Sequence, residues 1–222
     1  MKSCLLIFDC DGVLVDSEFV GNQIQAELLT QNGLQFTVES SLRKFLGMSS
    51  ADMRKCLQEE YNFILTEQLA NELAHKTQQA LQKQQAALLE PIWTVLKDVP
   101  KCIASNSSHE WINKMLELSN QAAVFPSKQI FSAYEVKRGK PYPDLFLYAA
   151  KKMGFRRADC LVIEDSIAGI KAAKAAQMEV VGFLGGEHTK FEWYKEQLVA
   201  QEIPLVQTAL ELLQYINKEA IN

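Results

Sequence analysis

The sequence contains no apolar run that approaches the ~20 residues of a membrane-spanning helix, so we expect no membrane partner. It also has no surplus of basic residues: 23 Lys and Arg against 27 Asp and Glu give a formal net charge of −4. This balance lacks the basic footprint of a nucleic-acid-binding protein. The first apolar run begins within a few residues of the first Met, so we expect no signal peptide.

Cysteine and histidine are scarce and have no metal-binding spacing. The five cysteines are an odd number without a Cys-x-x-Cys pair, so we expect reduced thiols in a cytoplasmic protein. The three histidines, His75, His109 and His188, match no ligand motif and are predicted to be surface or structural residues. The tryptophans are spaced widely and are predicted to lie in the core or at a domain edge. They are Trp93, Trp111 and Trp193.

Residues 18–88 lack a convincing strand pattern and contain few glycines. Apolar residues there recur at helical spacing, with Gln, Lys and Glu between them. The Gln-rich part, residues 78–85, has the composition of a low-complexity segment, but its apolar phase favours a solvated helix face. Thr66 is a plausible helix start. This block is predicted to be a bundle of four or five helices.

The chain alternates between strands and helices from Pro91 onward. Apolar runs occur at 101–104, 129–131, 160–163, 179–184 and 205–206, and helical segments near 109–118, 143–153, 166–176, 189–199 and 208–218. Such alternation predicts a parallel sheet with right-handed crossovers, and the N-terminal strand must join it. At 222 residues, the chain is long enough for one such α/β core plus an insertion. We therefore expect an α/β core of residues 1–16 and 89–222 and a helical insertion of residues 17–88.

The first strand ends in two carboxylates, Asp9 and Asp11, followed by Gly12. Ligands of open α/β sheets bind at this end of a strand. Buried carboxylates cost free energy unless a cation or hydrogen bonds compensate them, so the pair suggests a nucleophile and a shared hard cation. A polar turn and a calcium loop are the alternatives. The calcium loop is disfavoured because Val20 stands where a bidentate Glu would be expected.

Three further motifs follow in order along the chain. Ser105-Asn106-Ser107 comes after the apolar run 102–104, Lys140 lies between Gly139 and Pro141, and Glu164-Asp165-Ser166 follows a third apolar run. With Asp9-x-Asp11-Gly12, this set resembles the haloacid dehalogenase superfamily of phosphotransferases in its capped subgroup. The resemblance covers nearly the whole chain. It implies a Rossmann-like α/β core with a mobile helical cap over the site.

The resemblance also implies a role for each motif residue. Asp9 would be the nucleophile, and Asp11 the general acid/base whose backbone carbonyl binds the metal. Ser105 and Asn106 would bind the phosphoryl group, although a serine at a strand end is also a common helix cap. Lys140 would neutralise the phosphoryl group and Asp9. Asp165 would bind Mg²⁺ directly, with Glu164 either a ligand or an acceptor for metal-bound water.

These features predict a magnesium-dependent phosphatase that hydrolyses a sugar or sugar-acid phosphate through an aspartyl-phosphate. The overall pattern looks closest to sugar-phosphate and 6-phosphogluconate phosphatases. The alternative is a β-phosphoglucomutase-type mutase, but those enzymes carry His and Arg where Gly21 and Ser50 stand here. The dehalogenase branch lacks Asp11, and a non-catalytic module would lack at least one motif residue. We expect a small phosphate ester as the partner and a monomer. Similar proteins also place Gly where Gln177 stands, next to a helix end.

Overall fold

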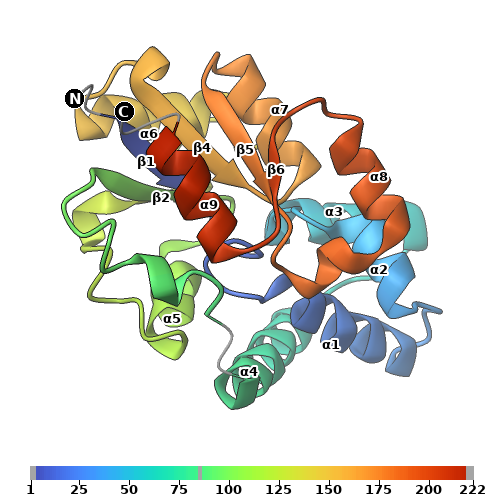
Figure 1. The fold of residues 1–222 in the computed structure, drawn as a ribbon. Helices are drawn as coiled ribbons and strands as arrows, with labels where there is room; N and C mark the ends of the chain where they lie inside the picture. Colours follow the sequence, from blue (N-terminus) through green and yellow to red (C-terminus); the bar gives the residue numbers. More distant parts are fainter. Residues whose placement is uncertain (1–3, 85–86, 219–222) are drawn as a thin grey trace.

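The computed structural model describes residues 4–84 and 87–218. Its centre is a six-stranded parallel sheet with the strand order β3-β2-β1-β4-β5-β6 (Figure 1). The strands are β1 (Leu5–Phe8), β2 (Lys101–Ser105), β3 (Ile130–Ser132), β4 (Cys160–Glu164), β5 (Glu179–Phe183) and β6 (Leu205–Val206). The predicted α/β class is therefore confirmed. The N-terminal strand lies in the middle of the sheet, between β2 and β4, so both later motif strands flank it.

Helices cover both faces of the sheet because alternate residues of each strand point to opposite sides. Leu6 and Phe8 belong to one apolar cluster, and Leu5 and Ile7 belong to the other. The helices that follow the strands are α5 (His109–Leu118), α6 (Asp144–Met153), α7 (Ile167–Ala175), α8 (Glu192–Val199) and α9 (Ala209–Ile216). The 3₁₀ turns are η1 (Glu90–Ile92), η2 (Ser127–Gln129), η3 (Ala133–Glu135), η4 (Arg157–Asp159) and η5 (Glu187–Lys190). Runs of apolar residues buried on both faces are typical of such a doubly covered sheet.

The predicted helix over 189–199 is shorter than expected. Residues Glu187–Lys190 form the 3₁₀ turn η5, and α8 begins only at Glu192. Phe191 has extended backbone angles, with φ −69° and ψ 120°, and therefore separates the two. The hydroxyl of Thr189 donates to the carbonyls of Leu184 and Gly186, at 2.8 and 2.7 Å, which holds the turn in place.

Residues 18–84 form four helices, within the expected range. They are α1 (Glu18–Gln31), α2 (Val38–Phe45), α3 (Ser50–Tyr61) and α4 (Glu67–Gln84). They share an apolar cluster of their own that includes Leu29, Phe45, Leu57 and Leu65, and they gather on one side of the sheet (Figure 1). Within the described ranges, none of the helices combines the length and apolarity needed to cross a membrane. The Gln-rich face follows α4, except that residue 85 lies outside the described residues.

Helices α6 and α7 are both followed by a residue in the left-handed backbone region, but by different residue types. Gly154 follows α6 with a φ of +79°, whereas Gln177 follows α7 with a φ of +57°. After α7, the N–H of Gln177 donates to the Lys174 carbonyl at 3.0 Å and the N–H of Met178 donates to the Ala173 carbonyl at 3.1 Å. This is the Schellman arrangement, in which glycine avoids the steric cost that a side chain pays at positive φ.

We therefore expect Gln177→Gly to stabilise the protein. Relief of the left-handed strain should exceed the extra entropy of the unfolded chain and raise the free energy of unfolding by about 0.5–1 kcal/mol. Urea unfolding measures this difference. The matched control is Gly154→Ala, which should lower stability by a similar amount. A less stable Gln177→Gly variant would show that the glutamine side chain contributes more than its backbone strain costs.

Candidate functional site

The turn that follows β1 places Asp9 and Asp11 at the carboxyl end of the central strand. The N–H of Asp9 donates to the Ile163 carbonyl at 3.0 Å, which extends the pairing with β4 by one residue. The chain then turns tightly at Gly12, whose φ is +84°. A Cβ on Gly12 would lie 1.9 Å from Oδ2 of Asp165. Only glycine therefore allows this turn to approach the end of β4 so closely.

Lys140 lies between two buried carboxylates. Its Nζ is 2.6 Å from Oδ1 of Asp9 and 2.5 Å from Oε1 of Glu164, and all three side chains are at most 10% exposed. Burial alone would lower the pKa of Lys140, but attraction by Asp9 and Glu164 outweighs it and raises that pKa. The lysine is charged at neutral pH and is the cation that compensates the two acids. The structure thus brings Lys140, expected to neutralise Asp9, into contact with that carboxylate.

Asn106 holds the backbone of Lys140. Its Oδ1 accepts from the Lys140 N–H at 2.9 Å, and its Nδ2 donates to the Lys140 carbonyl at 3.1 Å and to the Gly47 carbonyl at 3.3 Å. Both ends of the amide are therefore engaged, so this side chain positions the lysine loop and touches the segment between α2 and α3. Ser105 is buried at the end of β2, and its Oγ accepts from the Ser107 N–H at 3.1 Å.

Glu164 and Asp165 differ in how their oxygens are satisfied. Oε2 of Glu164 accepts from the N–H groups of Asp165 and Ser166 and from the Ser166 hydroxyl, at 3.1, 3.0 and 2.9 Å. A Cβ on Gly169 would lie 1.8 Å from Oε1 of Glu164, so glycine is required there as well. Within the described residues, neither carboxylate oxygen of Asp165 accepts a well-aligned hydrogen bond.

Asp9, Glu164 and Asp165 form an acidic group whose ligand atoms lie within 4.8 Å of one another. Burial is the main reason that the pKa values of Asp9 and Asp165 are raised, and Glu164 raises both further, while Lys140 opposes the rise. A buried cluster with unused carboxylate oxygens suits a hard divalent cation such as Mg²⁺. The Asp165 oxygens, which accept no well-aligned hydrogen bond in the described residues, are thus available as metal ligands.

His188 is a neighbour of this cluster that sequence reasoning did not identify. It is buried, not on the surface, and its Nε2 lies 2.8 Å from Oδ2 of Asp165, although without the alignment of a hydrogen bond. Burial lowers the pKa of His188 to about 4, so the ring is neutral at pH 7. The N–H of Glu187 donates to Oδ1 of Asp16 at 3.1 Å, which ties the η5 turn to the segment after β1. No spacing in the sequence signals this contact.

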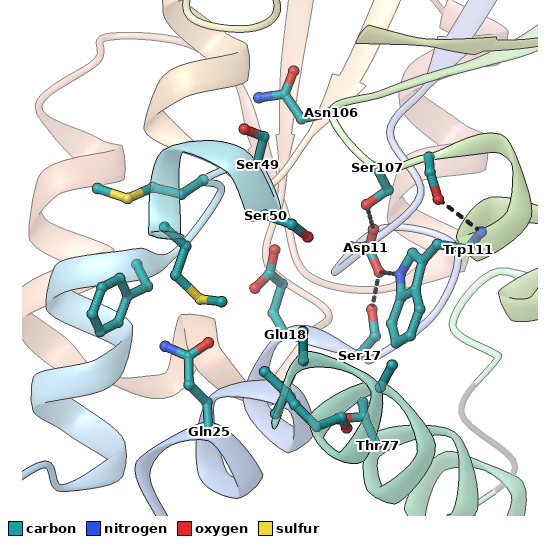
Figure 2. A pocket seen from close by; sticks show the side chains of 18 of the residues that line it. Asp11, Ser17, Glu18, Gln25, Ser49, Ser50, Thr77, Asn106, Ser107 and Trp111 are labelled. Atoms are coloured by element: carbon teal, nitrogen blue, oxygen red, sulfur yellow. Dashed lines mark hydrogen bonds between the residues drawn. The ribbon is translucent and has the colours of Figure 1, made fainter. Parts of the chain in front are cut away.

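Asp11 is held by three side-chain donors (Figure 2). Its Oδ1 accepts from the Ser17 hydroxyl at 2.6 Å and from Nε1 of Trp111 at 3.0 Å, and its Oδ2 accepts from the Ser107 hydroxyl at 2.7 Å. The sequence predicted Trp111 as a core or domain-edge residue and did not predict its hydrogen bond to Asp11. The Asp11 side chain therefore does not take part in the cluster around Lys140.

A cavity of about 710 Å³ opens between the four helices α1–α4 and the core. Asp11, Asn106 and Ser107 line its core side, whereas the more deeply buried Asp9, Lys140, Glu164 and Asp165 do not. Its helical side is lined by apolar residues, by Arg54 and by a set of neutral polar residues. The neutral polar residues are Asn22, Gln25, Ser49, Ser50, Asn71, Thr77 and Gln78. Glu18 also lies in the cavity (Figure 2), and burial together with the nearby Asp11 raises the pKa of its carboxyl group.

Removal of the lysine charge should destabilise the fold. Lys140→Met leaves Asp9 and Glu164 buried without a counter-charge, and loss of one partner of a buried ion pair typically costs about 3–5 kcal/mol. We expect a loss of about 3 kcal/mol in the free energy of unfolding by urea at pH 7.5 without divalent metal. Lys151→Met, on the exposed side of α6, is the matched control and should change stability little. Equal stability of the two variants would contradict the role of Lys140 as the compensating charge.

Known proteins resemble this chain over most of its length. A 6-phosphogluconate phosphatase of Escherichia coli (strain K12) is 28% identical over 187 residues, which cover 83% of this chain and 84% of that protein. A haloacid dehalogenase-like protein of unknown function from Agrobacterium tumefaciens has a crystal structure with a TM-score of 0.78 and 31% identity, and the match covers 97% of this chain and 98% of that chain.

A β-phosphoglucomutase from Clostridium difficile shares the fold, with a TM-score of 0.76 and 23% identity over 100% of this chain and 98% of that chain. The family model for haloacid dehalogenase-like hydrolases matches residues 6–183, which include every motif discussed above. The chain belongs to the haloacid dehalogenase-like hydrolases and is an enzyme of that family.

Proposed function

We propose that this protein is a magnesium-dependent phosphatase that hydrolyses a sugar or sugar-acid phosphate through an aspartyl-phosphate. The observation that carries the proposal is the buried Asp9–Lys140–Glu164 arrangement beside Asp165, with Asp11 at the end of the adjoining cavity. The similarity to a 6-phosphogluconate phosphatase supports the substrate class. We also propose that the enzyme acts in the cytoplasm as a monomer on a small-molecule substrate.

Asp9 would attack phosphorus as the nucleophile. Within the described ranges, the only side chain that hydrogen-bonds to the Asp9 carboxylate is Lys140, through Oδ1. The other oxygen is then the one to form the bond to phosphorus, as the bond to the leaving oxygen breaks. Attack by a carboxylate replaces one difficult step by two easier ones, because the acyl phosphate is itself readily hydrolysed. Lys140 would offset the negative charge on Asp9 and on the phosphoryl oxygens.

Asp11 would act as the general acid and base. It would give its proton to the leaving alkoxide in the first step and take a proton from the attacking water in the second. Its place in the cavity wall, beside Ser107, suits this role because both the leaving group and the water approach from the cavity. Two further residues would arrange the binding of the phosphoryl group. Ser105 would do so by ordering the backbone of Ser107, and Asn106 by holding Lys140.

Asp165 and Asp9 would hold Mg²⁺ together with the backbone carbonyl of Asp11. Glu164 fits the part of a positioning acid better than that of a direct ligand, because Lys140, Ser166 and two backbone N–H groups already occupy its oxygens. When bound, Mg²⁺ supplies charge that neutralises and orients the phosphoryl group against Asp9.

We propose that residues 17–88 act as a cap domain that binds the remainder of the substrate. The neutral amides and hydroxyls on the cap side of the cavity suit sugar hydroxyl groups. Gly21 and Ser50, which stand where mutases carry His and Arg, both line the cavity. The two cations of the wall already have partners: Arg54 is engaged by the Leu65 carbonyl and by Glu67, and Lys114 is paired with Glu117. A second phosphate would therefore lack dedicated cations, which favours hydrolysis over a mutase reaction.

The proposal is tested by phosphate release from a panel of phosphorylated metabolites in the presence of Mg²⁺. We expect release from hexose or sugar-acid phosphates by the wild type, and a loss of at least ~100-fold in Asp9→Asn with an unchanged circular dichroism spectrum. Asp98→Asn, at an exposed position, is the matched control. An Asp9→Asn variant with substantial activity would exclude the aspartyl-phosphate route.

A second assay of the wild type distinguishes a phosphatase from a mutase. With β-glucose 1-phosphate as substrate, phosphorus NMR should show inorganic phosphate, at a rate that added glucose 1,6-bisphosphate does not improve. Stoichiometric formation of glucose 6-phosphate, with little free phosphate, would favour the mutase and leave the roles of Asp9, Asp11 and the metal intact.

Asp165→Asn should raise the stability of the metal-free protein and remove its stabilisation by Mg²⁺. The pKa of Asp165 lies well above its ordinary value of 3.8, so the folded protein holds the proton more tightly than the unfolded chain does. The ionised carboxylate therefore costs stability at pH values above the folded-state pKa, and this cost disappears below 3.8. Without metal at pH 7.5, the variant should gain about 1 kcal/mol or more.

Mg²⁺ at about 10 mM, a concentration above a millimolar Kd, should stabilise the wild type. The same addition should not stabilise Asp165→Asn. Thermal unfolding with and without Mg²⁺ measures both effects, with Asp98→Asn as the control. Equal stabilisation of the wild type and of Asp165→Asn by Mg²⁺ would exclude Asp165 as a ligand.

A further inference from the structure

Trp111 lies in the first turn of α5 and hydrogen-bonds to Asp11, 100 residues earlier in the chain. We propose that Trp111 is a positioning residue for the general acid and base, and that it selects which oxygen of Asp11 carries the proton. The inference rests on the proposed function, because it assigns a new residue to the Asp11 step of that reaction.

The two oxygens of Asp11 have different surroundings. Oδ1 accepts from both the Ser17 hydroxyl and the Trp111 indole N–H, whereas Oδ2 accepts from the Ser107 hydroxyl alone. A carboxylate oxygen has two lone pairs in its plane, so two donors saturate Oδ1. Oδ2 keeps one lone pair, and it is therefore the oxygen that can receive a proton from the water and return one to the leaving group.

The chemistry of the donors strengthens this difference. Ser107 occupies one lone pair of Oδ2, so it can keep donating while the free lone pair of that oxygen takes up the proton. An indole N–H only donates, so a proton on the Trp111 side of Oδ1 would directly face it, and a proton on the other side would displace the hydrogen bond from Ser17. Proton exchange at Oδ2 is thus compatible with all three donors, whereas exchange at Oδ1 would displace either Trp111 or Ser17.

The indole is held by the start of its helix. The Oγ of Ser108, the N-cap of α5, accepts from the Trp111 backbone N–H at 3.2 Å. Ser107, which donates to Oδ2, directly precedes Ser108, which caps the helix that carries Trp111. One turn of backbone therefore sets the orientation of both carboxylate oxygens.

The test compares two substrates of nearly the same shape, p-nitrophenyl phosphate and phenyl phosphate. p-Nitrophenolate is a good leaving group that departs without a proton, whereas phenolate gains from general-acid assistance. Because kcat/KM includes only the steps up to cleavage of the P–O bond, it reports this assistance. Trp111→Phe keeps the ring but removes the N–H. We expect kcat/KM for phenyl phosphate to fall by about tenfold, and kcat/KM for p-nitrophenyl phosphate to change by less than about twofold.

The matched control is Trp93→Phe, which removes an indole N–H that donates to Oε1 of Gln121 at 2.8 Å, away from Asp11. It should leave the ratio of the two kcat/KM values unchanged even if it lowers stability. Trp111→Met, which also lacks an N–H, repeats the test in case the phenylalanine variant fails to fold.

An equal loss with both substrates in the Trp111 variants would show that Trp111 acts only as cavity wall or scaffold, and unchanged kinetics would show that the indole bond is not used. Either result overturns the inference while the wild type remains a phosphatase. Failure of the wild type to release phosphate from either aryl ester with Mg²⁺ would instead overturn the proposed function.

Discussion

The ammonium group of Lys140 between Asp9 and Glu164 is the interaction on which the rest of the site depends. Two neighbouring strands, β1 and β4, end in carboxylates that are removed from water, and neither could be buried alone without a large cost in free energy. The lysine comes from the loop before α6, where Asn106 accepts from the Lys140 N–H and donates to the Lys140 carbonyl. The amide of Asn106 thus connects the end of β2 to the charge balance of β1 and β4.

A second network surrounds Asp11 and is chemically different from the first. Around Lys140, one cation compensates two acids, whereas the side chains that donate to the Asp11 carboxylate in the described part of the chain are neutral hydroxyls and an indole. Asp9 and Asp11 are two residues apart, but they belong to separate environments, one deeply buried and one in the cavity wall. Separate environments of this kind let two identical side chains serve as nucleophile and as acid/base.

The fold could be predicted from the sequence to a large extent, because strands buried on both faces leave continuous apolar runs and α5 and α7 begin with serine caps. The motif residues were also expected at one edge of the sheet, where the structure brings Asp9, Lys140, Glu164 and Asp165 together. His188 and Trp111 could not be predicted in this way. Their contacts depend on how η5 and α5 pack against the turn after β1, and no local pattern encodes that packing. The double engagement of Asn106 was missed for the same reason.

The glycines at the base of the site have a consequence for how this enzyme can change over evolution or in the laboratory. A single methyl group at Gly12 or Gly169 would lie less than 2 Å from an oxygen of Asp165 or Glu164, so this side of the site tolerates almost no variation. The opposite wall, made of Asn22, Gln25 and Thr77 among others, is contributed by helices that share their own apolar cluster. Libraries aimed at that wall can therefore explore new substrates while the chemistry stays constant, which is how one reaction can diversify into many specificities.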